Sequence, residues 1–172
     1  MEHLAFIFSA LGTVCVCVSP LLKGKNMKLI LLCVFSANAL VGASYLVTGA
    51  INGAVTCFVC AVQAIINYFF DRKNKRLPIW LIAVYALAFI VVNILVFEHI
   101  FDLITMVASL TFIMCIGQKT GSKYRFWVLI NTLLWILYDL LMQTYGPLLI
   151  HGIQLITVIS GMVIHDIKKK PV

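Results

Sequence analysis

Residues 29–70 decide the fold: LILLCVFSANALVGASYLVTGAINGAVTCFVCAVQAIINYFF contains no Asp, Glu, Lys or Arg. A helix rises about 1.5 Å per residue, so crossing the hydrocarbon of a bilayer takes about 20 apolar residues. A stretch of 42 residues is too long for one crossing and fits two. The segment Thr48–Gly53, TGAING, supplies the Gly and Asn that a tight turn between two helices requires.

The composition of the whole chain agrees with a membrane protein. Of its 172 residues, 63% are hydrophobic and 11% are charged, whereas a soluble domain has about 25% charged residues. The net charge of +7 sits in short clusters between apolar runs, which is typical of topology signals that contact lipid headgroups rather than nucleic acid. We therefore expect an all-α membrane protein whose partner is the lipid bilayer, with no nucleic acid.

The apolar runs outside residues 29–70 bring the expected number of transmembrane helices to seven. Pro78 suits the first turn of the fourth helix, and Tyr145-Gly146-Pro147 is expected to form the turn before the last one. The seven expected spans are Leu4–Leu22, two within Leu29–Phe70, Pro78–Phe97, Ile100–Gly117, Phe126–Gln143 and Pro147–Ile164.

The positions of the basic residues predict the orientation. With seven spans, all 13 Lys and Arg fall in the first, third and fifth loops and at the C-terminus, on one side of the membrane. The other side carries only Glu2, Glu98 and Asp102. Basic loops stay in the cytoplasm, so we expect the N-terminus outside and the C-terminus in the cytoplasm.

A spacing match suggests an internal repeat. Asn38, Tyr45 and Gly53 have the same spacing as Asn131, Tyr138 and Gly146, at an offset of 93 residues. Two three-helix units in the same orientation need one extra helix between them, so the match favours a 3+1+3 plan with parallel repeats, a known transporter layout. The expected units are a first triple-helix bundle, a linker helix and a second bundle, at residues 1–76, 77–98 and 99–172.

Two segments resemble a known superfamily. The segment at 131–168, NTLLWILYDLLMQTYGPLLIHGIQLITVISGMVIHDIK, resembles the tail of the SWEET/PQ-loop/PnuC (MtN3-like) superfamily. The segment at 37–69, ANALVGASYLVTGAINGAVTCFVCAVQAIINYF, extends the likeness, which is closest to the YgjV-like bacterial inner membrane family. The resemblance implies a multi-pass protein of the bacterial cytoplasmic (inner) membrane and a transport function.

The same resemblance implies where a solute would bind. In sugar-transporting relatives a Trp and a polar residue about four turns later face a central cavity, and these places fall on Trp135 and His151. His151 stands where those relatives have Asn, which argues against a sugar. The corresponding places in the first repeat are Gly42 and Phe58, so no two-fold symmetric polar cage is expected. Pro20 corresponds to the proline that kinks the first helix of the relatives.

Polar residues inside the expected spans are the candidate site. Asp139 is the acidic residue that lies well inside a span, where an ionised group is costly unless paired or hydrated. Two helix faces, by helical spacing, carry the candidates: Asn131, Trp135, Tyr138, Asp139 and Met142 on one, and His151, Gln154, Val158 and Gly161 on the other. These faces either meet over a cavity where Asp139 or His151 holds solute or carries a proton, or they join helices by hydrogen bonds.

Other polar residues favour structural roles. We expect interhelical hydrogen bonds from Asn38, Gln63, Asn67 and Asn93, and Gln63 is also a candidate solute contact. The six cysteines lie in apolar runs and are expected to be packing residues, although Cys57-x-x-Cys60 imitates a redox motif. We find no catalytic, metal or cofactor motif, so neither an enzyme nor a cofactor is expected.

The leading hypothesis is a transporter or facilitator for a small polar solute that works by alternating access around a site near the membrane midplane. The alternative is a receptor or assembly partner with the same fold that transports nothing. A transporter needs a polar cavity, whereas a packing-only bundle would bury Trp135 and His151 against apolar neighbours. The sequence leaves open a homo-oligomer and the identity of the solute.

Overall fold

The computed structural model describes residues 2–23, 26–48, 51–75, 77–95, 97, 99–143 and 145–167. Within these ranges the chain forms seven α-helices and two short helical turns, so the all-helical expectation is confirmed. The elements are α1 (Glu2–Val18), the 3-10 turn η1 (Ser19–Leu21), α2 (Met27–Thr48), α3 (Ile51–Arg72), α4 (Ile79–Leu95), α5 (Asp102–Ile116), α6 (Gly121–Leu141), α7 (Tyr145–Met162) and the π-helical turn η2 (Val163–Ile167).

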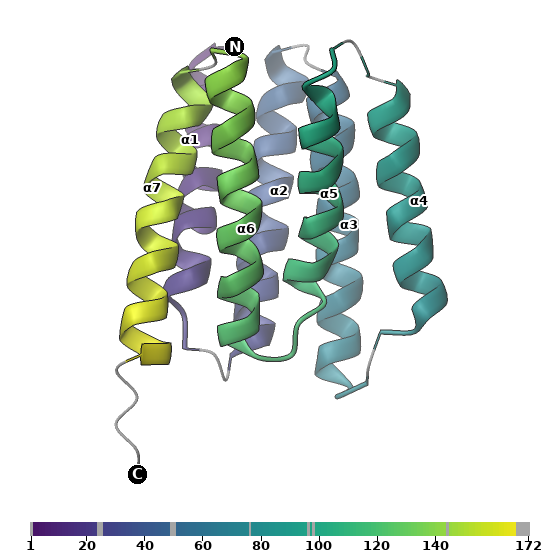
Figure 1. Ribbon diagram of the computed structural model, residues 1–172, viewed down its shortest axis with the longest axis vertical. Helices are drawn as coiled ribbons and strands as arrows, with labels where there is room; N and C mark the ends of the chain where they lie inside the picture. The colour runs from purple at the N-terminus through teal and green to yellow at the C-terminus, as the bar shows by residue number, and fades with distance from the viewer. Residues whose placement is uncertain are drawn as a thin grey trace.

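Four of these helices are long and apolar enough to cross a membrane: α2, α3, α6, and α7 with η2. The other three, α1, α4 and α5, are apolar but have only 15 to 17 residues each. All seven run alongside one another from one end of the molecule to the other (Figure 1). The helical membrane protein is confirmed, and seven crossings remain a prediction.

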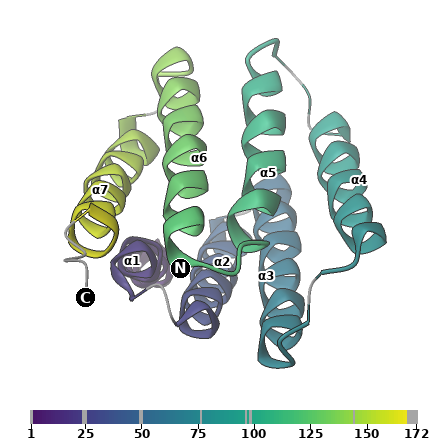
Figure 2. The same ribbon diagram turned by 60° about the horizontal axis from the view of Figure 1, so that its bottom comes forward.

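The helices form two layers. Figure 2 shows α1, α2 and α3 in one row and α7, α6, α5 and α4 in the other. Neighbours within each row pack closely, and the main helix contacts between the rows lie at the edges, where α1 meets α7 and α3 meets α4. The space between the middles of the two rows is where a cavity can form.

Some helix boundaries differ from those expected. Helix α6 begins at Gly121 rather than at Phe126, and residues Tyr145–Pro147 belong to the start of α7 rather than to a turn. A proline is tolerated in the first turn of a helix, because the N–H that it lacks has no partner there. The preceding turn contains Gln143, whose φ is 55°. Residues 51–53 likewise belong to α3.

Several expectations fall on parts of the chain outside the described residues. They include the centre of the first expected turn (Gly49 and Ala50), the side chains of Tyr45 and Gly53, and the charges of Lys25, Arg76, Glu98 and Lys168–Lys170. The internal repeat, its three units and the orientation therefore remain predictions.

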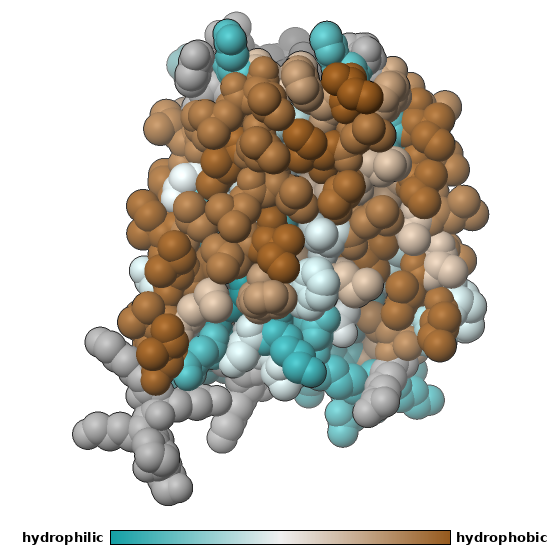
Figure 3. All heavy atoms as spheres, viewed as in Figure 1, coloured by the Kyte–Doolittle hydropathy of each residue, from teal (hydrophilic) through white to brown (hydrophobic). Residues whose placement is uncertain are grey.

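The two ends of the bundle differ. The N-terminal end is the end at which α1 begins, and the basic end is the opposite one, where α1–α2, α3–α4 and α5–α6 are connected (Figure 1). The basic end carries Lys23, Lys73, Lys75, Lys119 and Lys123, and Figure 3 shows hydrophilic residues gathered there below a broad hydrophobic belt. Large apolar side chains such as Phe6 and Leu87, 74% and 62% exposed, are suited to contact lipid.

An apolar core joins the two layers in the basic half of the bundle. Its buried members come from α2, α3, α5, α6 and α7, so it spans the gap between the rows. They are Met27, Ile30, Leu31, Val34, Ala64, Cys115, Ile116, Tyr124, Val128 and Val158. We call this set the inner core. A smaller cluster, Cys60, Leu81, Tyr85, Phe89 and Ile113, fixes α4 against α3 and α5.

A polar network fastens α1 to α6 and α7 at the basic end. The Arg125 side chain, 1% exposed, donates to the carbonyls of Pro20 (3.4 Å) and Leu22 (3.1 Å) and pairs with Asp166, the Nη2–Oδ1 distance being 2.5 Å. The Ser122 hydroxyl donates to the same carboxylate at 2.5 Å. Arg125 was counted among the loop charges, and this was wrong because α6 begins four residues before it. We call these five residues the clasp.

Gly161 is needed where α7 crosses η1. A Cβ at this position would lie 2.3 Å from the Pro20 carbonyl oxygen, whereas a Cβ at Gly152 on the same helix would meet nothing within 4 Å. We expect Gly161→Ala to lower the free energy of unfolding by about 1–3 kcal/mol through overpacking. The matched change Gly152→Ala should raise it by about 0.5–1 kcal/mol, since Ala favours the helix. Thermal unfolding in detergent measures both, and equal midpoints for the two variants would contradict the close contact.

Candidate solute-binding cavity

A cavity of about 670 Å³ lies between the two helix layers. Its volume is within the range of about 300–1,000 Å³ that is usual for small-molecule sites. It reaches the N-terminal end at His99, which is exposed, and extends toward the basic end as far as Ser19 and Tyr124. The hydroxyls of these last two are 2.8 Å apart and hydrogen-bonded, so the cavity stops at the inner core.

Helix α6 supplies the most polar wall of the cavity. All five residues expected to share one face of this helix line it: Asn131, Trp135, Tyr138, Asp139 and Met142. They share that face because their spacing follows the helical repeat. On α7, His151 and Gln154 also line the cavity, whereas Val158 and Gly161 pack further down, in the inner core and against η1.

Asp139, His151 and Trp135 form a compact group across the α6–α7 interface. Asp139 Oδ2 and His151 Nδ1 are 2.6 Å apart, and the Asp139 side chain is 3% exposed. The Trp135 indole stacks on the His151 imidazole with ring centroids 5.7 Å apart and an interplanar angle of 15°. An ionised carboxylate far from water is tolerable only when it is paired, and His151 provides that pairing. The carboxylate and Trp135 in turn hold the imidazole in one orientation toward the cavity.

Asp102 is a second carboxylate in the cavity, and sequence alone did not single it out as a site residue. It was counted among the charges on the outer side, at the start of the fifth expected span, and it is the first residue of α5, where it accepts the backbone N–H of His99 at 2.7 Å. Its other oxygen accepts the Tyr138 hydroxyl at 3.2 Å, which ties α5 to α6. A carboxylate at a helix N-terminus is favoured by the helix dipole, and this preference was the signal available in the sequence.

The wall formed by α1, α2 and α3 carries small neutral polar groups instead. They are Ser9, Thr13, Asn38, Ser44 and Thr56. No aromatic counterpart of Trp135 fits on α2, because a Cβ at Gly42 would already lie 3.2 Å from the Cys57 Cβ and 3.3 Å from the Phe58 ring. The cavity is thus asymmetric, as the pairs Trp135/Gly42 and His151/Phe58 led us to expect. Sequence alone did not single out the hydroxyls, since Ser and Thr in apolar helices commonly bond to their own backbone.

The asparagine side chains of the bundle form different kinds of hydrogen bond. Interhelical hydrogen bonding is confirmed for Asn67, which donates to the Ile116 carbonyl at 3.1 Å, and for Asn93, which bonds Ser109 and Thr105 on α5. Asn131 donates to the Ala108 carbonyl and to Thr111 on the same neighbouring helix. The Asn38 amide instead donates within its own helix.

Gln63 departs from this pattern. It is 1% exposed, and neither its amide nitrogen nor its amide oxygen has a hydrogen-bond partner. The prediction of an interhelical bond is wrong for Gln63. Gln63 is also absent from the lining of the cavity, unlike the other six candidate residues.

The charges around the cavity have one predominant sign. Its described lining residues include the carboxylates of Asp102 and Asp139 and the imidazoles of His99 and His151, and none of them is Lys or Arg. The buried guanidinium of Arg125 lies behind the cavity floor, in the clasp. In a low-dielectric surrounding, such a cavity disfavours an anion and accepts a neutral or cationic guest.

The fold and the cavity define a helical membrane protein with a ligand-sized chamber, lined by apolar and polar side chains, between two layers of helices. The model of the family described as "Imp-YgjV: Bacterial inner membrane protein" matches residues 4–169. The chain therefore belongs to this family of bacterial inner membrane proteins, which confirms the YgjV-like resemblance and the membrane in which we expected it. No curated protein and no solved structure matches the chain.

Proposed function

We propose that the protein is a carrier for a small polar solute and works by alternating access. The observation that supports this most is the cavity itself, in which an Asp139–His151 pair and a stacked Trp135 face an open volume inside an otherwise apolar bundle. A bundle that serves packing alone would bury Trp135 and His151 against apolar side chains. Here both line the cavity and are only partly buried.

The one-sided shape of the cavity supports the same proposal. It reaches the N-terminal end at His99, while the inner core and the clasp close the basic end. A carrier exposes its site to one side of the membrane at a time, by rocking one group of helices against another. The geometry fits a state open toward the N-terminal end, and the two layers are the bodies that would move.

The lining of the cavity narrows the class of solute. Two carboxylates and no Lys or Arg among the described lining residues favour a neutral or cationic solute. The hydroxyls and the amide on α1–α3 offer hydrogen bonds, and the Trp135 face offers a flat apolar surface. We therefore propose a small solute with several hydrogen-bonding groups and no net negative charge.

We also propose that the N-terminal end faces the periplasm and the basic end the cytoplasm. Lys23, Lys73, Lys75, Lys119 and Lys123 lie in or next to the α1–α2, α3–α4 and α5–α6 connections, which share one end of the bundle (Figure 1), and basic loops are retained in the cytoplasm. A C-terminal green fluorescent protein fusion is expected to fluoresce, and a C-terminal alkaline phosphatase fusion to be inactive. The reverse pair of results would invert the orientation.

Uptake into proteoliposomes tests the proposed function. Purified protein is reconstituted and offered radiolabelled solutes in three sets, neutral, cationic and anionic, each of small polar molecules. We expect uptake above that of empty liposomes for at least one neutral or cationic solute and for no anion. Trp135→Ala should lower that uptake about tenfold, since one stacking contact contributes on the order of 1–1.5 kcal/mol.

Leu133→Ala is the matched control, because Leu133 lies on the same helix with its side chain 49% exposed. It should retain the uptake of the wild type. If none of the solutes enters, or if both variants behave alike, the proposed carrier function fails. Tight binding of a solute without uptake would instead favour the receptor alternative.

A further inference from the structure

The amide of Gln63 is an unpaired polar group in the middle of the bundle. Both of its polar atoms are buried without a hydrogen-bond partner, and the residue is 1% exposed. Most buried polar side-chain atoms in proteins have a partner, so each exception calls for a reason. An unpaired amide in a dry core is unfavourable for folding, which suggests that Gln63 is kept for another state of the protein.

The position of Gln63 on α3 points to that reason. Cys60, three residues before it, lines the large cavity, and Asn67, four residues after it, lines a second, small pocket at the basic end. The spacing of Thr56, Cys60, Gln63, Asn67 and Asp71 follows the helical repeat, so all five share one face of α3. Only Gln63 among them lines neither space. The gap from Cys60 to Asn67 along the helix is about 10 Å.

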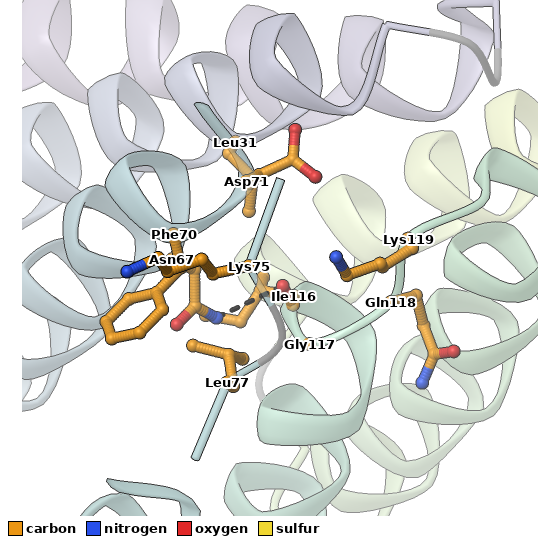
Figure 4. A pocket seen from close by; sticks show the side chains of 10 residues that line it. All are labelled: Leu31, Asn67, Phe70, Asp71, Lys75, Leu77, Ile116, Gly117, Gln118 and Lys119. Carbon is orange, nitrogen blue, oxygen red and sulfur yellow. Dashed lines mark hydrogen bonds between the residues drawn. The ribbon is translucent and has the colours of Figure 1, made fainter. Parts of the chain in front are cut away.

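The small pocket has an opening of its own toward the basic loops. Its volume is about 20 Å³, room for about one water molecule. Figure 4 shows Asn67 and Asp71 of α3 with Lys75 and Lys119 of the adjoining loops around it. Asn67 there bonds the Ile116 carbonyl at the end of α5. The pocket therefore lies toward the basic end on the same face of α3 that carries Gln63.

Helices α2, α3 and α5 line both the large cavity and the small pocket. Helix α2 contributes Val34 to the cavity and Leu31 to the pocket, and α5 contributes Cys115 to the cavity and Ile116 to the pocket. All four of these side chains belong to the inner core, which closes the gap between the spaces. At the other edge of the bundle, by contrast, the clasp binds α1 to α6 and to η2 beyond α7. The basic half is thus held by ionic contacts on one side, and on the Gln63 side by apolar packing and neutral hydrogen bonds such as that from Asn67 to the Ile116 carbonyl.

We propose that solute leaves the cavity toward the basic end along this face of α3, and that Gln63 is the hydrogen-bonding site on that inner half of the route. This inference rests on the proposed carrier function. When α2 and α3 separate from α5, the Gln63 amide gains water or solute as a partner. Its donor and acceptor suit a neutral or cationic solute that leaves the Asp139–His151 group.

Labelling from each side of the membrane tests the route without knowledge of the solute. A Gln63→Cys variant of the full chain is treated with the membrane-impermeant reagent 2-(trimethylammonium)ethyl methanethiosulfonate in right-side-out and in inside-out vesicles. Peptide mass spectrometry locates the modified thiols, so the native cysteines stay in place. Val158→Cys is the matched control, because Val158 is fully buried in the inner core on α7, next to the clasp.

We expect Cys at position 63 to be modified from the basic side at least tenfold faster than Cys at position 158. The thermal midpoint of the Gln63→Cys variant should match that of the wild type, which shows that the variant is folded. No reaction at position 63, equal rates at the two positions, or faster reaction at position 158 would each overturn the route. If solute is taken up but position 63 is not labelled, the proposed route fails and the carrier function stands. If position 63 is labelled but no solute is taken up, the carrier function fails.

Gln63→Leu provides a second readout that needs no reagent. Leu has a similar volume and no hydrogen-bonding group, so the thermal midpoint should stay the same or rise. Uptake of the solute that the wild-type protein moves best should fall at least tenfold. Uptake within twofold of the wild type would overturn the role of Gln63.

Discussion

The variant Arg125→Met is expected to lose about 3–5 kcal/mol of unfolding free energy, the usual result of removing one partner from a buried ion pair. The guanidinium is almost fully buried and donates to the Asp166 carboxylate and to two carbonyls just beyond α1. Met fills much of the same volume but donates nothing, so the carboxylate loses its cationic partner and the two carbonyls lose this donor. The measurement is reversible unfolding in mixed micelles, followed by Trp fluorescence.

Lys123→Met is the matched control, two residues earlier on α6 and exposed. It should change the unfolding free energy by no more than about 0.5 kcal/mol, as surface substitutions usually do. The double variant Arg125→Met with Asp166→Leu should recover a large part of the loss, because no buried charge is then left unpaired. A single Arg125 variant as stable as the Lys123 control would show that the clasp contributes nothing to folding.

The clasp also bears on how the bundle could open. It holds α1, α6 and the end of α7 together at the basic end, while α2, α3 and α5 meet there through apolar contacts and a neutral hydrogen bond from Asn67 to the Ile116 carbonyl. Apolar surfaces can separate and repack with less loss than a buried ion pair, whose parted charges would both need new partners. Movement of α2 and α3 away from α5 is therefore the easier opening, and it is the one that uncovers Gln63.

The sequence predicted those parts of the site that depend on helical spacing alone. The five residues predicted to share one face of α6 line one cavity because an α-helix fixes their relative directions. For the faces of α6 and α7 the sequence left two arrangements open, a shared cavity or interhelical hydrogen bonds. The structure has both, since Asp139 and His151 line the cavity and contact each other.

The sequence failed where the outcome depended on a helix boundary or on tertiary packing. Arg125 and Lys123 were both counted as loop charges. In the structure Arg125 is buried and Lys123 is exposed. The boundary of α6 decides between the two, and apolar length places a boundary only to within several residues. Gln63 and Asn67 look alike in sequence, and only the packing of α5 shows that one is bonded and the other is not.

The Asp139–His151 pair gives the strongest expected effect on transport. Asp139→Asn keeps the size of the side chain and removes its charge, so the imidazole of His151 loses a charge-assisted contact of 2.6 Å. Such contacts contribute about 1.5–3 kcal/mol, and about 1.4 kcal/mol corresponds to a factor of ten. Uptake in proteoliposomes should therefore fall by about 10- to 100-fold, while the thermal midpoint falls little, because a buried carboxylate is itself unfavourable.

The variant His151→Asn should lower uptake by a similar factor, and the double variant should be little worse than either single one. This non-additivity is expected of residues that act as a unit. Leu137→Ala, on the same helix as Asp139 and 47% exposed, is the control and should keep wild-type uptake. Losses that multiply in the double variant would mean that Asp139 and His151 act separately. A drop in thermal midpoint that parallels the loss of uptake would assign the pair to folding and not to the solute.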